Sequence, residues 1–279
     1  MKGSQPWLSE EMALPMEPGW LEEQGYSRGF ERVAGLDEVG RGPWAGPVVA
    51  AAVVLPREFL VAGFGLQVSS RPETRNSKLE IKDSKLLRLE EREALAPWIK
   101  EKAVAWGLGV VGSEEIDRLN ILKASLLAMA HAFRQLHAVP DCLLIDGPHK
   151  IPAEFLVADT EDRGWGIENR SSILDLRSLK IPHQRAIKKG DRLCLSIAAA
   201  SIIAKVARDQ MMMEYDRLYP EYGFSKNKGY GSPLHLAALN RYGPSPIHRR
   251  SFKPVRQRLK IALSGEAISA QPLFSKIED

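Results

Sequence analysis

Two periods of hydrophobic positions run along this chain, and they predict a mixture of strands and helices. Compact apolar runs that are rich in valine, or bounded by glycine and an acid, predict strands. They are Val33 to Asp37, Val48 to Leu55, 103–112 and 141–147. Longer segments in which leucine, isoleucine or alanine returns at helical spacing predict helices. They are 86–103, 113–137 and 198–219.

Capping signals mark the ends of two helices. Ser113 stands before two glutamates, in the manner of a helix N-cap followed by an acidic first turn. Ser232 and Pro233 predict the start of a further helix, and Gly243 predicts its end.

The order of the elements predicts one α/β domain around a mixed sheet, because strands come first and helices are interleaved afterwards. We expect this domain to span 33–263. Residues 1–32 mix proline, glycine, glutamate and tryptophan and predict an N-terminal arm. Residues 148–182 show no clear period and predict an insertion, and residues 264–279 predict a frayed tail.

Charge changes this picture, because it is concentrated in the last third of the chain. The 279 residues carry a formal net charge of +4. Between Ile181 and Lys260 there are 16 lysines and arginines against 5 acids. A basic region of this kind indicates a polyanionic partner. A solvated basic surface explains the charge equally well.

The pattern gives no sign of a membrane protein. No apolar run reaches the roughly 18 to 20 residues that a spanning helix needs, and the first residues lack the pattern of a signal peptide. Cys142 and Cys194 lie in apolar surroundings and are expected to be buried, reduced thiols. We therefore expect a cytoplasmic location.

Four acids stand at strand ends or beside glycines: Asp37, Glu38, Asp146 and Asp191. Ligands of open α/β sheets gather beyond the carboxyl ends of the strands, so acids from different strands can meet there. Clustered carboxylates repel one another, and a divalent cation removes that conflict. Hard oxygen ligands suit Mg²⁺ or Mn²⁺. Two such ions about 3.5–4 Å apart could activate a water and stabilise a leaving oxygen on phosphorus.

The adjacent acids Asp37 and Glu38 raise a difficulty for this metal site. Neighbouring residues of a strand point to opposite faces. Both can serve one metal cluster only if the strand is ending, or if one of them acts through water or backbone. A turn or a helix cap explains each acid taken singly, whereas four acids beside a basic surface favour the metal site.

The loop after the acid pair reads Gly40, Arg41, Gly42, which is neither a Walker loop nor a dinucleotide fingerprint. Its exposed backbone could lie against a sugar edge, where a ribose 2′-hydroxyl distinguishes RNA from DNA, or it could be a tight turn. Ser84 and Lys85, within KDSK, fit either a phosphate-binding turn or a helix N-cap.

Basic residues alternate with aromatics and glycines further along the chain. Tyr230 lies between two glycines, so its ring could stack on a base or sugar, or it could be an ordinary surface tyrosine. His235 and His248 are expected to be hydrogen-bonded structural residues. Phosphate contacts could come from Lys226, Lys228, Arg249 and Arg250.

Together, these motifs resemble the bacterial ribonuclease HII family, which belongs to the type 2 ribonucleases H. The resemblance extends from about Val33 to Val255. It rests on AGLDEVGRGPWAGPVVAAAVVL, DSKLL, NILKASLLAMAHA, LLIDG, KKGD, SIAAASIIAKVARD, YPEYGFSKNKGYGS and GPSPIHRRSF. Motifs of this length in this order are specific, whereas no four-residue piece is.

The resemblance implies a ribonuclease H-like α/β fold, with a mixed five-stranded sheet flanked by helices and a C-terminal helical extension. It implies a Mg²⁺- or Mn²⁺-dependent endonuclease that cleaves the RNA strand of RNA–DNA hybrids. It also implies nicking on the 5′ side of single ribonucleotides in duplex DNA, with 3′-hydroxyl and 5′-phosphate products. The family's catalytic metal ligands fall on Asp37, Glu38, Asp146 and Asp191, its junction-reading loop on Gly40, Arg41 and Gly42, and its tyrosine beside the ribonucleotide on Tyr230.

Three features depart from the family pattern: the longer N-terminal arm, the long segment 148–182 and the tail. The segment 148–182 lies between two of the acids, and we expect it to loop out because KKGD and the alanine-rich helix after it are intact. The tripeptide Gly40 to Gly42 favours ribonuclease HII over the related ribonuclease HIII, which carries a different tripeptide there.

Two functions of other classes remain as alternatives. A non-catalytic nucleic-acid-binding module explains the basic region but leaves the four acids idle, and metal-dependent activity separates it from a nuclease. A nucleotide-dependent α/β enzyme lacks a phosphate loop, and a nucleotide titration tests it. We expect a monomer. QPLF, Gln271 to Phe274, is compatible with a short contact to a replication clamp, although a disordered end explains it better.

Overall fold

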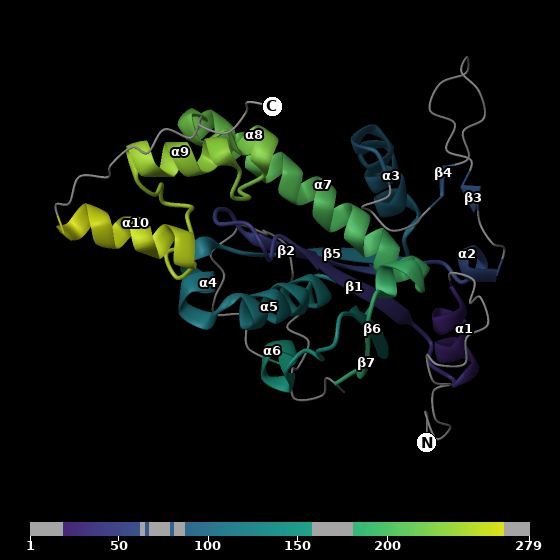
Figure 1. Ribbon diagram of the computed structural model, residues 1–279. Helices are drawn as coiled ribbons and strands as arrows, with labels where there is room; N and C mark the ends of the chain where they lie inside the picture. Colours follow the sequence, from purple (N-terminus) through teal and green to yellow (C-terminus); the bar gives the residue numbers. More distant parts are fainter. Residues whose placement is uncertain (1–18, 62–64, 67–78, 81–86, 158–180, 265–279) are drawn as a thin grey trace, which may run out of the picture.

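The computed structural model describes residues 19–61, 65–66, 79–80, 87–157 and 181–264 (Figure 1). Its central sheet has five strands in the order β5-β2-β1-β6-β7. The strands are β1 (Val33–Val39), β2 (Val48–Val54), β5 (Ala105–Val111), β6 (Cys142–Asp146) and β7 (His183–Ile187). A separate two-stranded sheet joins β3 (Gly65–Leu66) and β4 (Leu79–Glu80).

The five-stranded sheet is mixed, as the sequence predicted. β1 pairs antiparallel with β2, and β2 pairs antiparallel with β5. On the other side, β1 runs parallel to β6, and β6 runs parallel to β7. The carboxyl ends of β1 and β6 therefore lie next to each other at one edge, where the predicted acids Asp37 and Asp146 stand.

Helices cover both faces of this sheet (Figure 1). α5 packs on one face, and α7 packs on the other together with α3. The remaining helices follow the loops or extend the chain beyond α7. The helices are α1 (Trp20–Ser27), α2 (Glu58–Val61), α3 (Leu89–Lys102), α4 (Ser113–Leu119), α5 (Ile121–Arg134), α6 (Ala153–Val157), α7 (Leu195–Leu218), α8 (Phe224–Asn227), α9 (Pro233–Tyr242) and α10 (Lys253–Ser264), with short 3-10 turns η2 (Gly190–Arg192) and η3 (Pro220–Tyr222).

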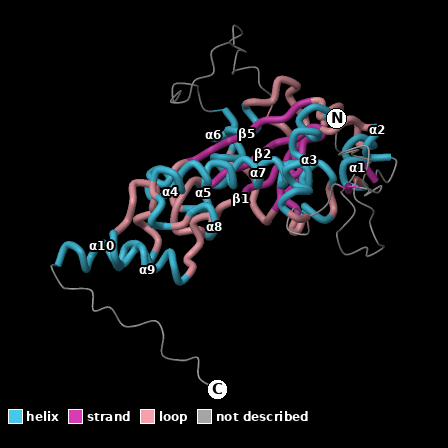
Figure 2. The backbone as a smooth tube through the Cα atoms, turned by 90° about the horizontal axis from the view of Figure 1, so that it is seen from above, coloured by secondary structure: helices cyan, strands magenta, loops and turns pink. Residues whose placement is uncertain are grey.

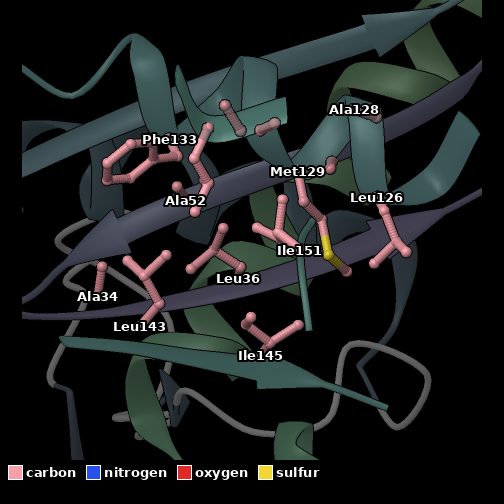
Figure 3. Close-up of a cluster of buried hydrophobic side chains, with 14 of the residues drawn as sticks. Ala34, Leu36, Ala52, Leu126, Ala128, Met129, Phe133, Leu143, Ile145 and Ile151 are labelled. Atoms are coloured by element: carbon pink, nitrogen blue, oxygen red, sulfur yellow. The ribbon is translucent and has the colours of Figure 1, made fainter. Parts of the chain in front are cut away.

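The hydrophobic core follows the alternation of the strands. Leu36, Leu143 and Ile145 project from β1 and β6 toward Met129 and Phe133 of α5 (Figure 3). The residues that alternate with these along each strand face α7. Gly35 is one of these, and a Cβ at this position would overlap the backbone of Ser196 and Ile197. This close approach sets the N-terminal part of α7 directly against β1.

Residues 19–32, the described part of the predicted arm, pack onto the domain. Leu21 of α1 is fully buried and shares a hydrophobic cluster with Phe30, Cys142 and Cys194. Both cysteines are buried and reduced, as predicted. Burial raises the pKa of the Cys142 thiol to about 12.

The single helix predicted over 113–137 is wrong. The chain forms two helices, α4 and α5, that meet at Asn120. Asn120 adopts a positive φ of 75°, and its side-chain oxygen accepts hydrogen bonds from the amides of Leu122 and Lys123 at 3.0 and 3.1 Å. An asparagine tolerates this conformation and caps the second helix. Ser113 is the first residue of α4, and Gly112 occupies the cap.

Helices α8, α9 and α10 form the C-terminal extension and lie at one end of the molecule (Figures 1 and 2). The connection between β1 and β2 points toward them (Figure 1). Among the described residues, no helix combines the length and apolar character that crossing a bilayer would require.

Candidate active site

Asp37 and Asp146 lie side by side at the carboxyl ends of two parallel strands. Leu36 pairs with Ile145 in the β1–β6 ladder, so the two acids follow one position later on neighbouring strands. Both acids lie on the α7 side of the sheet, because side chains alternate along a strand and the residues directly before the acids face α5. The structure thus brings together two acids that are 109 residues apart in the sequence.

Asp37 is buried, with 6% of its surface exposed. Its carboxylate accepts hydrogen bonds from the Glu38 amide at 2.7 Å and from the Ser201 hydroxyl on α7. Burial raises the pKa of Asp37 well above its usual range, and the charges of Glu38 and Asp146 raise it further. Burial and two neighbouring negative charges therefore destabilise the ionised form of Asp37.

Glu38 pairs with Ala50 across the β1–β2 ladder and Asp37 pairs with Ala51, so the two acids alternate along the strand. Glu38 nevertheless lies near enough to Asp37 and Asp146 for the three charges to interact. Its carboxylate pairs with Arg41 at 3.1 Å. The pKa of Glu38 is raised to about 7. Burial is the main cause and the nearby Asp146 charge adds to it, whereas the Arg41 guanidinium acts in the opposite direction. Strand β1 continues to Val39, beyond the end at Asp37 that the sequence predicted.

Asp191 reaches the same edge through the turn η2 rather than through a strand. The Gly190 amide donates a 2.7 Å hydrogen bond to Oδ1 of Asp146, which ties this turn to the end of β6. Lys189, just before it, has a left-handed conformation with φ 57°. Asp191 is 6% exposed and stands four residues before α7 begins.

The chemistry of these acids fits a divalent cation. Burial disfavours the ionised forms of Asp37 and Glu38, the neighbouring negative charge of Asp146 disfavours them further, and Arg41 forms an ion pair with Glu38. Carboxylate oxygens are the ligands that Mg²⁺ and Mn²⁺ prefer. As the side chains stand, no group of three or more His, Cys, Asp or Glu within the described part of the chain is close enough to surround an ion.

A buried arginine, Arg208 of α7, supports the loop beyond the acids. Its guanidinium donates hydrogen bonds to the carbonyls of Pro47 at 3.0 Å, Lys228 at 3.0 Å and Ala45 at 3.3 Å. Arg208 is fully buried. It therefore fastens the β1–β2 connection to the segment that carries Tyr230.

The prediction that Arg249 contacts a phosphate is wrong. Arg249 is fully buried, so its side chain cannot reach a phosphate directly. Its guanidinium donates to the carbonyls of Gly46 at 3.0 Å, Arg41 at 3.0 Å and Gly40 at 2.5 Å. Arg249 thus holds the Gly40 to Gly42 loop from behind. Burial and, to a smaller extent, the neighbouring Arg208 charge lower the pKa of Arg249 to about 9.

Tyr230 lies over the glycine loop. A Cβ on Gly42 would stand 3.3 Å from the Tyr230 ring, so the two residues are in contact range. The Trp44 amide donates a 2.8 Å hydrogen bond to the Gly229 carbonyl, which connects the chain after the glycine loop to the turn that carries Tyr230. Tyr230 remains 49% exposed and presents its ring beside the loop.

The sequence model of the family described as Ribonuclease HII matches residues 34–255. The chain belongs to the ribonuclease HII family. It is 46% identical over 240 residues to the ribonuclease HII of Desulfitobacterium hafniense (strain DSM 10664 / DCB-2), covering 86% of this chain and 75% of that protein. The family carries ribonuclease H activity, the endonucleolytic cleavage of RNA in RNA–DNA hybrids.

Two solved structures share the fold of this chain. The ribonuclease H2 from Pyrococcus horikoshii OT3 aligns with a TM-score of 0.58 and 26% identity, over 82% of this chain and 97% of that chain. Bst-RNase HIII, solved in complex with Mn²⁺, aligns with a TM-score of 0.59 and 22% identity, over 83% of this chain and 70% of that chain. The second likeness shows the fold alone.

Some predicted site residues lie outside the described residues. Ser84 and Lys85 are among them, and so is the segment Gln271 to Phe274. Lys228 is described and half-buried, with a positive φ of 52° and its carbonyl bound by Arg208. The monomeric state and the domain limits stay predictions.

The raised pKa values predict how pH affects the metal-free ribonuclease. A carboxyl group whose pKa is higher in the folded state stabilises the fold below its unfolded pKa near 4.5, and that contribution is lost as pH rises through the folded value. For Glu38 the window runs from about pH 4.5 to about 7. In EDTA, Glu38→Gln should therefore gain stability relative to the unmutated chain as pH rises through this window, by roughly 3 kcal/mol at pH 8.

Urea unfolding at pH 5 and pH 8 checks this expectation, and comparison of variants cancels the titration of other groups. Glu154→Gln, at an exposed position on α6, serves as the matched control. Addition of Mg²⁺ at pH 8 should reduce or reverse the advantage of Glu38→Gln. An advantage that is independent of pH would contradict the raised pKa of Glu38.

Proposed function

We propose that this ribonuclease cleaves the RNA strand of RNA–DNA hybrids and also nicks duplex DNA on the 5′ side of a single embedded ribonucleotide. The products would carry a 3′-hydroxyl and a 5′-phosphate. The observation that carries this proposal is the continuity of β1 with the glycine loop. Only Glu38 and Val39 lie between Asp37 and Gly40 in the sequence, so the proposed metal site and the proposed ribose-reading loop adjoin.

We assign Asp37, Glu38, Asp146 and Asp191 as the ligands of divalent cations, Mg²⁺ or Mn²⁺. Bound cations would activate a water for attack on phosphorus and stabilise the leaving oxygen. The protein's own residues orient the carboxylates. Ser201 and the Glu38 amide hold Asp37, and the Gly190 amide holds Asp146. Such fixed positioning is the main contribution a protein makes to phosphoryl transfer.

Gly40, Arg41 and Gly42 would recognise the ribose. Arg249 occupies the carbonyls of Gly40 and Arg41 and so fixes the orientation of the loop. The absence of a side chain at Gly42 leaves room for a sugar beside Tyr230. The 2′-hydroxyl both donates and accepts hydrogen bonds, and a rigid backbone can test for it.

Positive charge around this surface would attract the duplex. Arg250 is exposed and Lys228 is half-buried, and both are candidates for contacts with phosphates. Arg208 and Arg249 are buried behind the loop, where they add fixed positive charge and donate hydrogen bonds to backbone carbonyl groups. Such a field favours an anion in front of the loop.

Replacing Tyr230 with alanine is expected to impair nicking at a single ribonucleotide more than it affects folding. Loss of a stacking ring costs roughly 1–3 kcal/mol, or about 5- to 150-fold in rate. Single-turnover nicking of a duplex with one ribonucleotide measures the effect. Tyr242→Ala, which removes an equally exposed tyrosine from α9, is the control. Equal rates for both variants would remove Tyr230 from the recognition surface.

The direct test of the proposed function uses the full chain and three duplexes: an RNA–DNA hybrid, DNA with one ribonucleotide, and DNA alone. With Mg²⁺ or Mn²⁺ the first two should be cut and the third should not. EDTA should stop both reactions. Binding of the duplexes without any cleavage would favour a non-catalytic nucleic-acid-binding module instead.

A further inference from the structure

Two histidines form a hydrogen-bonded chain that ends on Tyr230. Nδ1 of His235 lies 2.8 Å from the Tyr230 carbonyl, and Nε2 of His235 lies 2.9 Å from Nε2 of His248. At the other end, Nδ1 of His248 receives the Ser245 amide at 2.9 Å. Three segments, the Tyr230 turn, α9 and residues 245–248, are therefore joined by two imidazole rings.

The direction of every hydrogen bond in this chain is determined by its ends. The Ser245 amide can only donate, so Nδ1 of His248 carries no proton. Neutral His248 then has its proton on Nε2 and donates it to Nε2 of His235. That leaves the proton of His235 on Nδ1, which donates to the Tyr230 carbonyl. The two rings are complementary tautomers, and a second proton on either ring would place two N–H groups against each other or against the Ser245 amide.

The surroundings favour these neutral rings. Both histidines are buried, His235 fully and His248 to within 1%. The rings of Trp44, Tyr222 and Phe224 stand 5.4 to 6.2 Å from that of His235. Burial lowers the pKa of both imidazoles, and that of His248 falls to about 3.

The contact with Tyr230 acts on its backbone. The residues before it, Lys228 and Gly229, have positive φ values of 52° and 84°, so the chain turns sharply there. The Tyr230 carbonyl receives both the His235 ring and the Ser232 amide, the latter at 2.8 Å. The ring of Tyr230 is half exposed, so few neighbouring side chains hold it in place. Its position over Gly42 therefore depends on the orientation of its backbone.

We propose that His235 and His248 are positioning residues for ribonucleotide recognition: as a complementary tautomer pair they hold the Tyr230 peptide so that its ring stays over the glycine loop. The proposal rests on the proposed role of Tyr230 in reading the ribonucleotide. It assigns the two histidines no contact with substrate and no transfer of protons during the reaction.

Two variants of His235 separate positioning from general stability. In His235→Asn the amide nitrogen takes the place of Nδ1 and can still donate to the Tyr230 carbonyl. In His235→Gln the side-chain end takes the place of Nε2 and keeps the contact with His248, while the carbonyl contact is lost. Each variant loses one of the two ring hydrogen bonds, so similar falls in melting temperature are expected.

The readout is the ratio of kcat/KM on a single-ribonucleotide duplex to kcat/KM on a long RNA–DNA hybrid. His235→Gln should lower this ratio about five- to tenfold, as loss of one buried hydrogen bond implies, and His235→Asn should keep it near that of the unmutated protein. Equal ratios for the two variants would overturn the proposal. If Tyr230→Ala lowers the ratio and His235→Gln does not, only this inference fails. If neither does, the recognition role of Tyr230 fails as well.

A spectroscopic measurement on the unmutated protein needs no activity. Nitrogen-15 spectra of its histidines at pH 7, assigned with the His235→Asn and His248→Gln variants, should show one ring protonated on Nδ1 and the other on Nε2. Rings with the same tautomer, or a doubly protonated ring, would overturn the proposal even if the kinetic result were as expected.

Discussion

Asp37→Asn is expected to abolish nicking while leaving duplex binding within about twofold. Asparagine keeps the size of the side chain, and its amide oxygen can accept the hydrogen bond from the Glu38 amide, so the fold is retained. What is lost is one negative charge among the proposed metal ligands. Because bound metal contributes several kcal/mol of charge stabilisation, the rate should fall by at least about 10³-fold.

Single-turnover cleavage and a binding titration in Ca²⁺ or EDTA measure the two quantities for Asp37→Asn. The matched control is Asp216→Asn on the same helix that supplies Ser201. Fifteen residues of helix separate positions 201 and 216, which is roughly 22 Å, and this control should nick at the normal rate. Retained nicking by Asp37→Asn at ordinary Mg²⁺ would exclude Asp37 from the metal site.

Arg208→Met should cause the largest loss of stability among single changes near the site. Methionine fills much of the space of the arginine but leaves the carbonyls of Ala45, Pro47 and Lys228 without their donor. Each buried acceptor left unsatisfied costs roughly 1–3 kcal/mol, so we expect a total loss of about 3–5 kcal/mol. The loop beyond the acids should also become less ordered, and nicking should fall even where the protein remains folded.

Urea unfolding gives the stability of Arg208→Met, and Arg217→Met provides the control, since Arg217 lies exposed further along α7. Arg208→Lys should recover only part of the loss, because an ammonium group cannot reproduce the planar fork that reaches three carbonyls. Stability equal to that of the Arg217→Met control would show that the loop does not depend on the buried guanidinium.

Much of the sheet could be predicted because its central strands are buried on both faces. The segments around Leu36, Val53 and Leu144 are nearly all apolar, which gives a strong signal. Strand β7 was not predicted, since His183 to Ile187 is an edge strand of mostly polar residues. The break at Asn120 was also missed, because the hydrophobic period continues through it and only the left-handed backbone of one residue reveals it.

The proximity of Asp37 and Asp146 was predictable, because each stands near the end of an apolar strand and the two strands are parallel neighbours. The role of the four acids as metal ligands stays a prediction. The burial of the two arginines was not predictable. The sequence around Arg249 is basic and polar, like a phosphate-binding surface, and Arg208 stands in an unremarkable helical segment. Most of the carbonyl groups that these two arginines bind lie more than 160 residues away in the chain, and no local sequence pattern reveals such partners. The hydrogen-bonded state expected for His235 and His248 is confirmed, although their link to each other required the fold.

A crystal structure of the protein grown with Mn²⁺, with anomalous diffraction data, tests the proposed metal site most directly. The proposal predicts anomalous density bonded to carboxylate oxygens of Asp37, Glu38, Asp146 and Asp191, with the side chains drawn closer together than they stand without an ion. Mn²⁺-dependent nicking in solution, combined with an occupied manganese site elsewhere on the molecule and none at these four acids, would contradict it.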